Sequence, residues 1–114
     1  MRFPSLILLL LLLNSCARST IDYNNRVENW PTLEPRIHVV SYDEMYKVCS
    51  KYGEFGKEVL ACAKFTYDPP ICDVWVTDPD GWTLQHELDH CLGYDHPGSN
   101  EMRNNFQKRM NKLK

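Results

Sequence analysis

The chain has 114 residues, which is enough for one small domain. Its 13 Lys and Arg residues are balanced by 15 Asp and Glu residues, so the formal net charge is −2 at pH 7. This composition lacks the basic surface that is typical of nucleic-acid-binding proteins, and we expect no nucleic-acid partner.

The first residues have the pattern of an export signal. Arg2 precedes the apolar run 6–13, which is shorter than the roughly 20 residues that span a bilayer. The run ends in Leu13-Asn14-Ser15-Cys16, which is similar to the lipobox of bacterial lipoproteins, where the cysteine carries the lipid. We therefore expect a lipoprotein signal peptide over residues 1–15. An ordinary signal peptide cut nearby, or an uncleaved anchor, is the alternative.

The lipobox resemblance implies a membrane attachment through lipid on Cys16 and a location in the cell envelope. Ala17 after the cysteine implies the periplasmic face of the outer membrane in a Gram-negative cell. Residues 16–35 are polar and interrupted by prolines, and we expect them to form a tether. Within it, Trp30 is expected either to pack on the edge of the domain or to contact lipid headgroups.

Four further cysteines follow the lipobox. In an oxidising compartment an even set of this kind predicts two disulfides, each of which would stabilise the fold by about 2–4 kcal/mol. No two of them have the Cys-x-x-Cys spacing of a zinc finger. The sequence leaves all three pairings open for Cys49, Cys62, Cys72 and Cys91.

The first part of the expected domain combines a strand and a helix. Residues 36–41 are rich in β-branched side chains and predict a strand, in which His38 is expected to be a surface residue without a role. Residues 42–51 have a helical pattern, with acids in the first turn. Gly53 and Gly56 are expected to bracket a turn.

Two more strands are expected at residues 58–67 and 71–77, joined by a turn at Asp68-Pro69-Pro70. The second run alternates, so that Cys72, Val74 and Val76 share one face. A helix is then expected from Trp82 or Thr83 to Leu92. Leu84, Leu88 and Leu92 would form its apolar back, and a disulfide from Cys91 would attach this helix to the sheet or to the earlier helix.

The polar side of this helix carries metal-binding chemistry. His86 and His90 are four residues apart, so their imidazoles lie side by side on one helix face and can bind one ion. Glu87 is placed beside that ion, where it can take a proton from a water. Gly93 can end the helix in the left-handed conformation and return His96 to the same ion. A surface helix with solvated histidines is the alternative.

The stretch His-Glu-x-x-His-x-x-Gly-x-x-His over residues 86–96 resembles the long zinc signature of the metzincin metallopeptidases. The resemblance implies one zinc ion held by His86, His90 and His96, with Glu87 as the general base. It also implies that residues 71–77 are an edge strand that docks an extended protein or peptide substrate. An ordinary sheet edge is the alternative for that strand.

Other residues near the motif allow two interpretations each. Asp89 and Asp95 either hold an imidazole N–H or, as we favour, are solvated carboxylates. Met102 is the nearest candidate for the methionine turn of the metzincins, but core packing explains it better. It would belong to a closing helix, capped by Ser99 or Asn100, whose apolar stripe comprises Met102, Phe106, Met110 and Leu113.

The sequence therefore predicts an α+β fold, a minimal zincin-like domain over residues 36–114, in which a small twisted sheet packs on the zinc helix and on one or two further helices. The expected function is that of a monomeric zinc endopeptidase that cleaves proteins or peptides at the cell envelope. Two alternatives stay open: a non-catalytic zinc-binding lipoprotein and a zinc-dependent peptidoglycan amidase.

Overall fold

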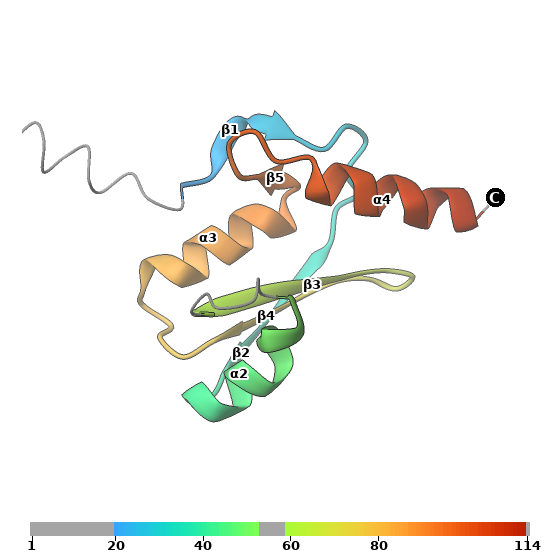
Figure 1. Ribbon diagram of the computed structural model, residues 1–114. Helices are drawn as coiled ribbons and strands as arrows, with labels where there is room; N and C mark the ends of the chain where they lie inside the picture. The colour runs from blue at the N-terminus through green and yellow to red at the C-terminus, as the bar shows by residue number, and fades with distance from the viewer. Residues whose placement is uncertain (1–19, 53–58, 114) are drawn as a thin grey trace, which may run out of the picture.

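The structure of the protein, a computed structural model, describes residues 20–52 and 59–113. The expected signal peptide, the lipid on Cys16 and the turn between Gly53 and Gly56 lie outside these residues. The described elements mix helices with two small sheets, which confirms the predicted α+β class (Figure 1). In chain order they are β1 (Asp22–Arg26), β2 (Glu34–Val39), α2 (Tyr42–Cys49), the 3-10 helix η1 (Ser50–Tyr52), β3 (Ala61–Tyr67), β4 (Pro70–Val76), α3 (Trp82–Cys91), β5 (Tyr94–Asp95) and α4 (Glu101–Lys112).

The larger sheet has the strand order β2-β4-β3. β2 pairs with β4 in parallel, and β3 and β4 form an antiparallel hairpin around the predicted proline turn. β4 therefore lies in the centre of the sheet, and the prediction that residues 71–77 form an edge strand is wrong. Because the strand has neighbours on both sides, its backbone cannot accept a substrate strand.

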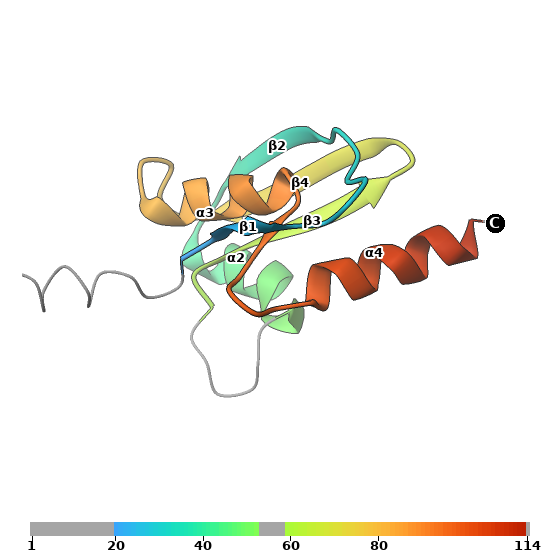
Figure 2. The same ribbon diagram turned by 90° about the horizontal axis from the view of Figure 1, so that it is seen from above.

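Layers of structure cover both faces of this sheet. α3, α4 and the small sheet of β1 and β5 lie on one face, and α2 lies on the other (Figures 1 and 2). The alternation of β4 supplies both cores, as the sequence predicts: Val74 and Val76 are fully buried toward α3, and Trp75 packs toward α2. α2 itself is capped by Ser41, whose side chain accepts a hydrogen bond from the backbone N–H of Glu44 at 3.3 Å.

The four described cysteines form two disulfides, one in each core. Cys49–Cys62 joins α2 to β3, and Cys72–Cys91 joins β4 to the end of α3. The helix that carries the histidines is thus attached to the sheet. Disulfides are typical of proteins outside the cytoplasm. Among residues 20–52 and 59–113, every helix is too short or too polar to cross a bilayer.

The segment expected to be a tether is largely part of the folded domain. From Asp22 onward the chain forms β1 and then enters β2, in which Pro35 pairs with Cys72. Val27, Trp30 and Leu33 are buried, and they fill the space between α3, β3 and α4. The prolines were misleading because β2 is an edge strand, where a missing N–H donor is tolerated. Residues 16–19 lie outside the described part of the chain.

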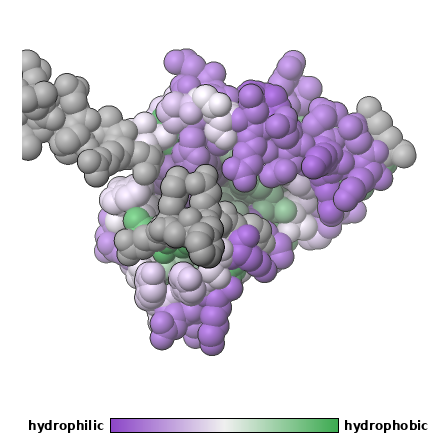
Figure 3. All heavy atoms as spheres, in the orientation of Figure 1, coloured by the Kyte–Doolittle hydropathy of each residue, from purple (hydrophilic) through white to green (hydrophobic). Residues whose placement is uncertain are grey.

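Two leucines of the predicted apolar stripes are exposed. Leu92 is 56% exposed because α3 ends at Cys91 and the chain turns away from the core. Leu113 is 64% exposed because it follows the last turn of α4. Within α4 only Phe106 is buried, and the space-filling view shows a strongly hydrophilic surface over this helix (Figure 3). The other predicted boundaries agree with the structure to within a few residues.

Candidate metal centre

The three predicted histidines meet at one point. His86 and His90 project from the same face of α3, and His96 follows β5. The Nε2 atom of His86 lies 3.0 Å from that of His96 and 3.2 Å from that of His90. Tetrahedral coordination at 2.0–2.1 Å would separate two ligand nitrogens by about 3.3 Å. The ligand atoms of all three histidines lie within 4.8 Å of one another, so the group could hold one metal ion.

The hydrogen bonding of His90 suits a metal ligand. Its Nδ1 atom lies 2.7 Å from the backbone oxygen of Tyr94, which can only accept, so Nδ1 carries the proton and Nε2 has a free lone pair. Burial lowers the pKa of His90, which favours the neutral form that binds metals. The sequence analysis assigned no role to Tyr94. Its position four residues after His90 was the available signal.

Gly93 brings His96 round for two physical reasons. Its φ is +96°, the left-handed conformation that the sequence predicts, and its N–H donates to the oxygen of His90 at 2.9 Å. In addition, a Cβ at this position would lie 2.6 Å from Cγ of Trp30. Glycine is thus required both by the turn and by the close approach of a buried indole.

β1 holds the loop that carries His96. The side-chain amide of Asn25 donates to the backbone oxygens of His96 and Ser99, both at 2.9 Å. The N–H of Val27 donates to the oxygen of Gly93 at 2.9 Å. These contacts connect residues more than sixty positions apart. The sequence did not reveal the role of Asn25, because no local pattern predicts a contact with residues this far along the chain.

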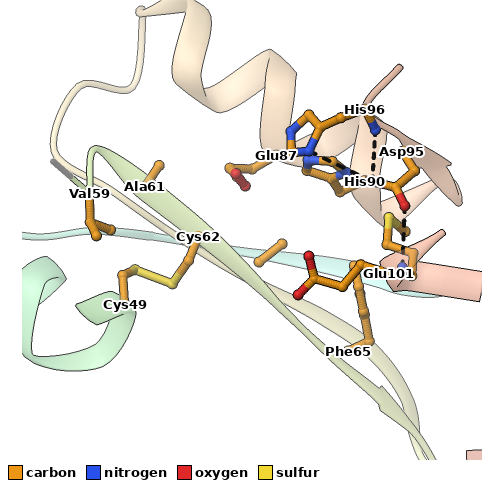
Figure 4. A pocket seen from close by; sticks show the side chains of 12 residues that line it. Cys49, Val59, Ala61, Cys62, Phe65, Glu87, His90, Asp95, His96 and Glu101 are labelled. Atoms are coloured by element: carbon orange, nitrogen blue, oxygen red, sulfur yellow. Dashed lines mark hydrogen bonds and ion pairs between the residues drawn. A yellow bond between two sulfur atoms is a disulfide. The ribbon is translucent and has the colours of Figure 1, made fainter. Parts of the chain in front are cut away.

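Glu87 lines the same cavity as His90 and His96, and it is not a member of the candidate ligand group. It is buried, and burial raises the pKa of its carboxyl to about 7. Its side chain extends into a cavity of about 210 Å³ between α3 and β3 (Figure 4). The cavity is lined by Cys49, Val59, Ala61, Cys62, Ala63, Phe65, Glu87, His90, Asp95, His96, Glu101 and Met102.

Asp89 and Asp95 are buried, so the prediction of solvated carboxylates is wrong. Asp89 accepts hydrogen bonds from the Tyr23 hydroxyl at 2.6 Å and from the Gln85 amide at 3.0 Å. These donors compensate for the loss of water around the charge. The hydrogen bond that Tyr23 donates to Asp89 raises the pKa of the Tyr23 phenol. Asp89 thereby connects β1 to α3.

Asp95 accepts from two backbone N–H groups. Its Oδ1 atom accepts from His96 at 2.7 Å, and its Oδ2 atom accepts from Met102 in the first turn of α4 at 3.2 Å. The Nδ1 atom of His96 is 3.7 Å from Asp95, too far for a hydrogen bond. Met102 lies in a helix and packs against the core, which confirms the packing interpretation over a methionine turn.

No protein-family model, curated protein or solved structure matches this chain. The geometry of the described residues defines the class of site by itself. It is a three-histidine group that could bind one metal ion, with a buried carboxylate beside it and a small cavity in front of that carboxylate.

Proposed function

We propose that this protein is a zinc-dependent metalloendopeptidase of the cell envelope. The observation that carries the proposal is the convergence of the Nε2 atoms of His86, His90 and His96 beside the buried Glu87. Imidazole ligands suit zinc, and three protein ligands with one position left for substrate or water are typical of catalytic rather than structural zinc. Among the described residues, no fourth side chain joins this group. The resemblance of residues 86–96 to the metzincin signature supports the same assignment.

A zinc ion at this site would polarise the scissile carbonyl and make an attacking water more acidic. The role of Glu87 is to accept the proton of that water and to deliver it to the leaving amine nitrogen. Its buried position in the cavity that His90 and His96 also line supports this role. The contact of His90 with the backbone of Tyr94 keeps the ligating nitrogen free of a proton.

A peptide substrate would dock along β3 instead of the strand at 71–77. β3 is an edge of the three-stranded sheet, and its residues Ala61, Ala63 and Phe65 line the cavity that Glu87 enters. An extended peptide can pair with such an edge through its backbone. This placement would bring one peptide bond close to both Glu87 and the three histidines, and the protein would act as a monomer.

Two observations support the cell-envelope location. Residues 1–16 have the pattern of a lipoprotein signal with Cys16 as the lipid acceptor. The two disulfides are also typical of proteins in an oxidising compartment. The lipid would hold the peptidase at the membrane and limit the range of proteins that it reaches.

The test is a comparison of zinc binding with peptide hydrolysis in two variants. Glu87→Gln is expected to bind one zinc ion and to lose hydrolysis by a factor of about 10² to 10⁴, because the general base is gone. His90→Ala is expected to lose both. Metal content is measured by atomic absorption and hydrolysis by release of a fluorescent peptide, with and without chelator.

Equal hydrolysis by Glu87→Gln and the unmodified protein would reject the mechanism. Zinc binding without peptide hydrolysis in the unmodified protein would favour a non-catalytic zinc-binding lipoprotein. Release of fragments from purified cell wall, with no cleavage of peptides, would change the substrate to an amide in peptidoglycan.

A further inference from the structure

A second carboxylate, that of Glu101, enters the same cavity from the opposite side. Glu101 is the first residue of α4, and its exposed side chain extends toward the space between α3 and β3 into which Glu87 also points (Figure 4). Within residues 20–52 and 59–113, its carboxylate forms no ion pair and accepts no hydrogen bond. Besides Asp95, which accepts two backbone hydrogen bonds, the cavity lining thus contains Glu87 and the carboxylate of Glu101, which has no ion pair or hydrogen bond with the described residues.

Hydrogen bonds of the backbone connect the start of α4 with the loop that carries His96. Its N–H donates to Oγ of Ser99 at 3.3 Å, and the N–H of the next residue, Met102, donates to Asp95. Asp95 also accepts from the backbone of His96 at 2.7 Å. One buried carboxylate therefore connects the backbone of the third histidine with the start of α4, where Glu101 lies.

Part of the cavity wall is apolar. Ala61, Ala63 and Phe65 lie on one face of β3, and Met102 closes the cavity from α4. An apolar wall beside the exposed carboxylate of Glu101 matches a side chain with an aliphatic stem and a cationic tip, which can bury the stem and keep the charge at the edge of the solvent. An acidic side chain would meet the repulsion of Glu101.

We propose that Glu101 makes this cavity a subsite for a lysine or arginine side chain next to the scissile bond. This assignment rests on the proposed peptidase function and specifies its substrate class. The exposed carboxylate would attract the cation, and the apolar walls would hold the stem. Peptides with a neutral side chain of the same length would gain the contact with the apolar wall but not the attraction to Glu101.

The experiment compares two N-acetylated pentapeptides that differ only at the central residue, which is lysine or norleucine. We expect the zinc-loaded protein to cleave the lysine peptide with the higher kcat/KM. In Glu101→Gln the ratio of the two kcat/KM values is expected to fall about tenfold, the effect of losing one charge-assisted contact. Glu28→Gln, which changes the net charge equally at an exposed position outside the cavity, is expected to keep the ratio.

Binding of the same two peptides to zinc-loaded Glu87→Gln, with and without Glu101→Gln, separates this inference from the proposed function. Cleavage of peptides without a lysine preference, or with a preference that Glu101→Gln leaves intact, would overturn the subsite and retain the peptidase. Binding of lysine over norleucine that depends on Glu101, without any cleavage, would support the subsite and reject the peptidase. An equal fall in kcat/KM for both peptides in Glu101→Gln would show that Glu101 has a structural role at the start of α4, and it would overturn the subsite.

Discussion

The two halves of the candidate metal centre are built in different ways. His86 and His90 lie on α3, where the four-residue spacing alone places them side by side and the Cys72–Cys91 disulfide attaches the helix to the sheet. His96 lies in the loop after β5, and contacts from residues 25–30 hold that loop. The helix half therefore follows from local periodicity, and the loop half depends on a segment more than sixty residues earlier.

This difference implies separate responses to mutation. Changes in β1 or at Trp30 are expected to move the third ligand while the first two keep their positions. Three imidazoles bind an ion more tightly than two, so a mutation that displaces His96 would lower the expected metal affinity even when the domain remains folded. Damage to α3 would affect both halves.

Among the variants that test this difference between the two halves, Gly93→Ala is expected to have the largest effect on stability and zinc binding. The added Cβ would be 2.6 Å from Trp30, and the backbone would have to keep a φ of +96°, so we expect a loss of about 3 kcal/mol in the free energy of unfolding together with weaker zinc binding. Gly98→Ala is the control. Gly98 also has a positive φ but nothing within 4 Å of its added Cβ, so about 1 kcal/mol is expected from strain alone. If urea unfolding gives the same loss in the free energy of unfolding for both variants, the contact with Trp30 does not contribute to the effect of Gly93→Ala.

A smaller effect, confined to metal affinity, is expected from Asn25→Asp. The variant loses both donors to the loop carbonyls of His96 and Ser99, so zinc affinity should fall about tenfold in competition with a chelating dye. Asn24→Asp makes the same charge change at the neighbouring exposed position and is expected to bind zinc normally. Matching affinities in the two variants would mean that the loop positions His96 without help from β1.

The smallest effect is expected from Leu92→Ala. Leu92 is 56% exposed at the junction between α3 and the loop, and the free energy of unfolding should change by no more than about 0.5 kcal/mol. Leu88→Ala, which truncates a side chain packed against the core, should cost about 1–2 kcal/mol. If thermal unfolding shows a larger loss of stability for Leu92→Ala than for Leu88→Ala, Leu92 belongs to the apolar face of α3, as the sequence predicts.

Local patterns predicted much of the fold. The spacing of His86 and His90, the glycine at 93 and the alternation of β4 depend on interactions within a few residues, and the structure agrees with all three. The zinc ion, the peptidase reaction and the lipid on Cys16 stay predictions. The errors concern long-range packing. Nothing local distinguishes Val27, Trp30 and Leu33 in a tether from the same side chains in a core.

The sequence by itself determined the helix with two histidines on one face, the turn that follows it and the presence of an even set of cysteines, because each is a property of neighbouring residues. Only the tertiary structure decided which cysteines pair, that β4 is central, that Asp89 and Asp95 are buried, and that Asn25 supports His96. These features depend on which distant surfaces exclude water together, and that is a property of the whole packed chain.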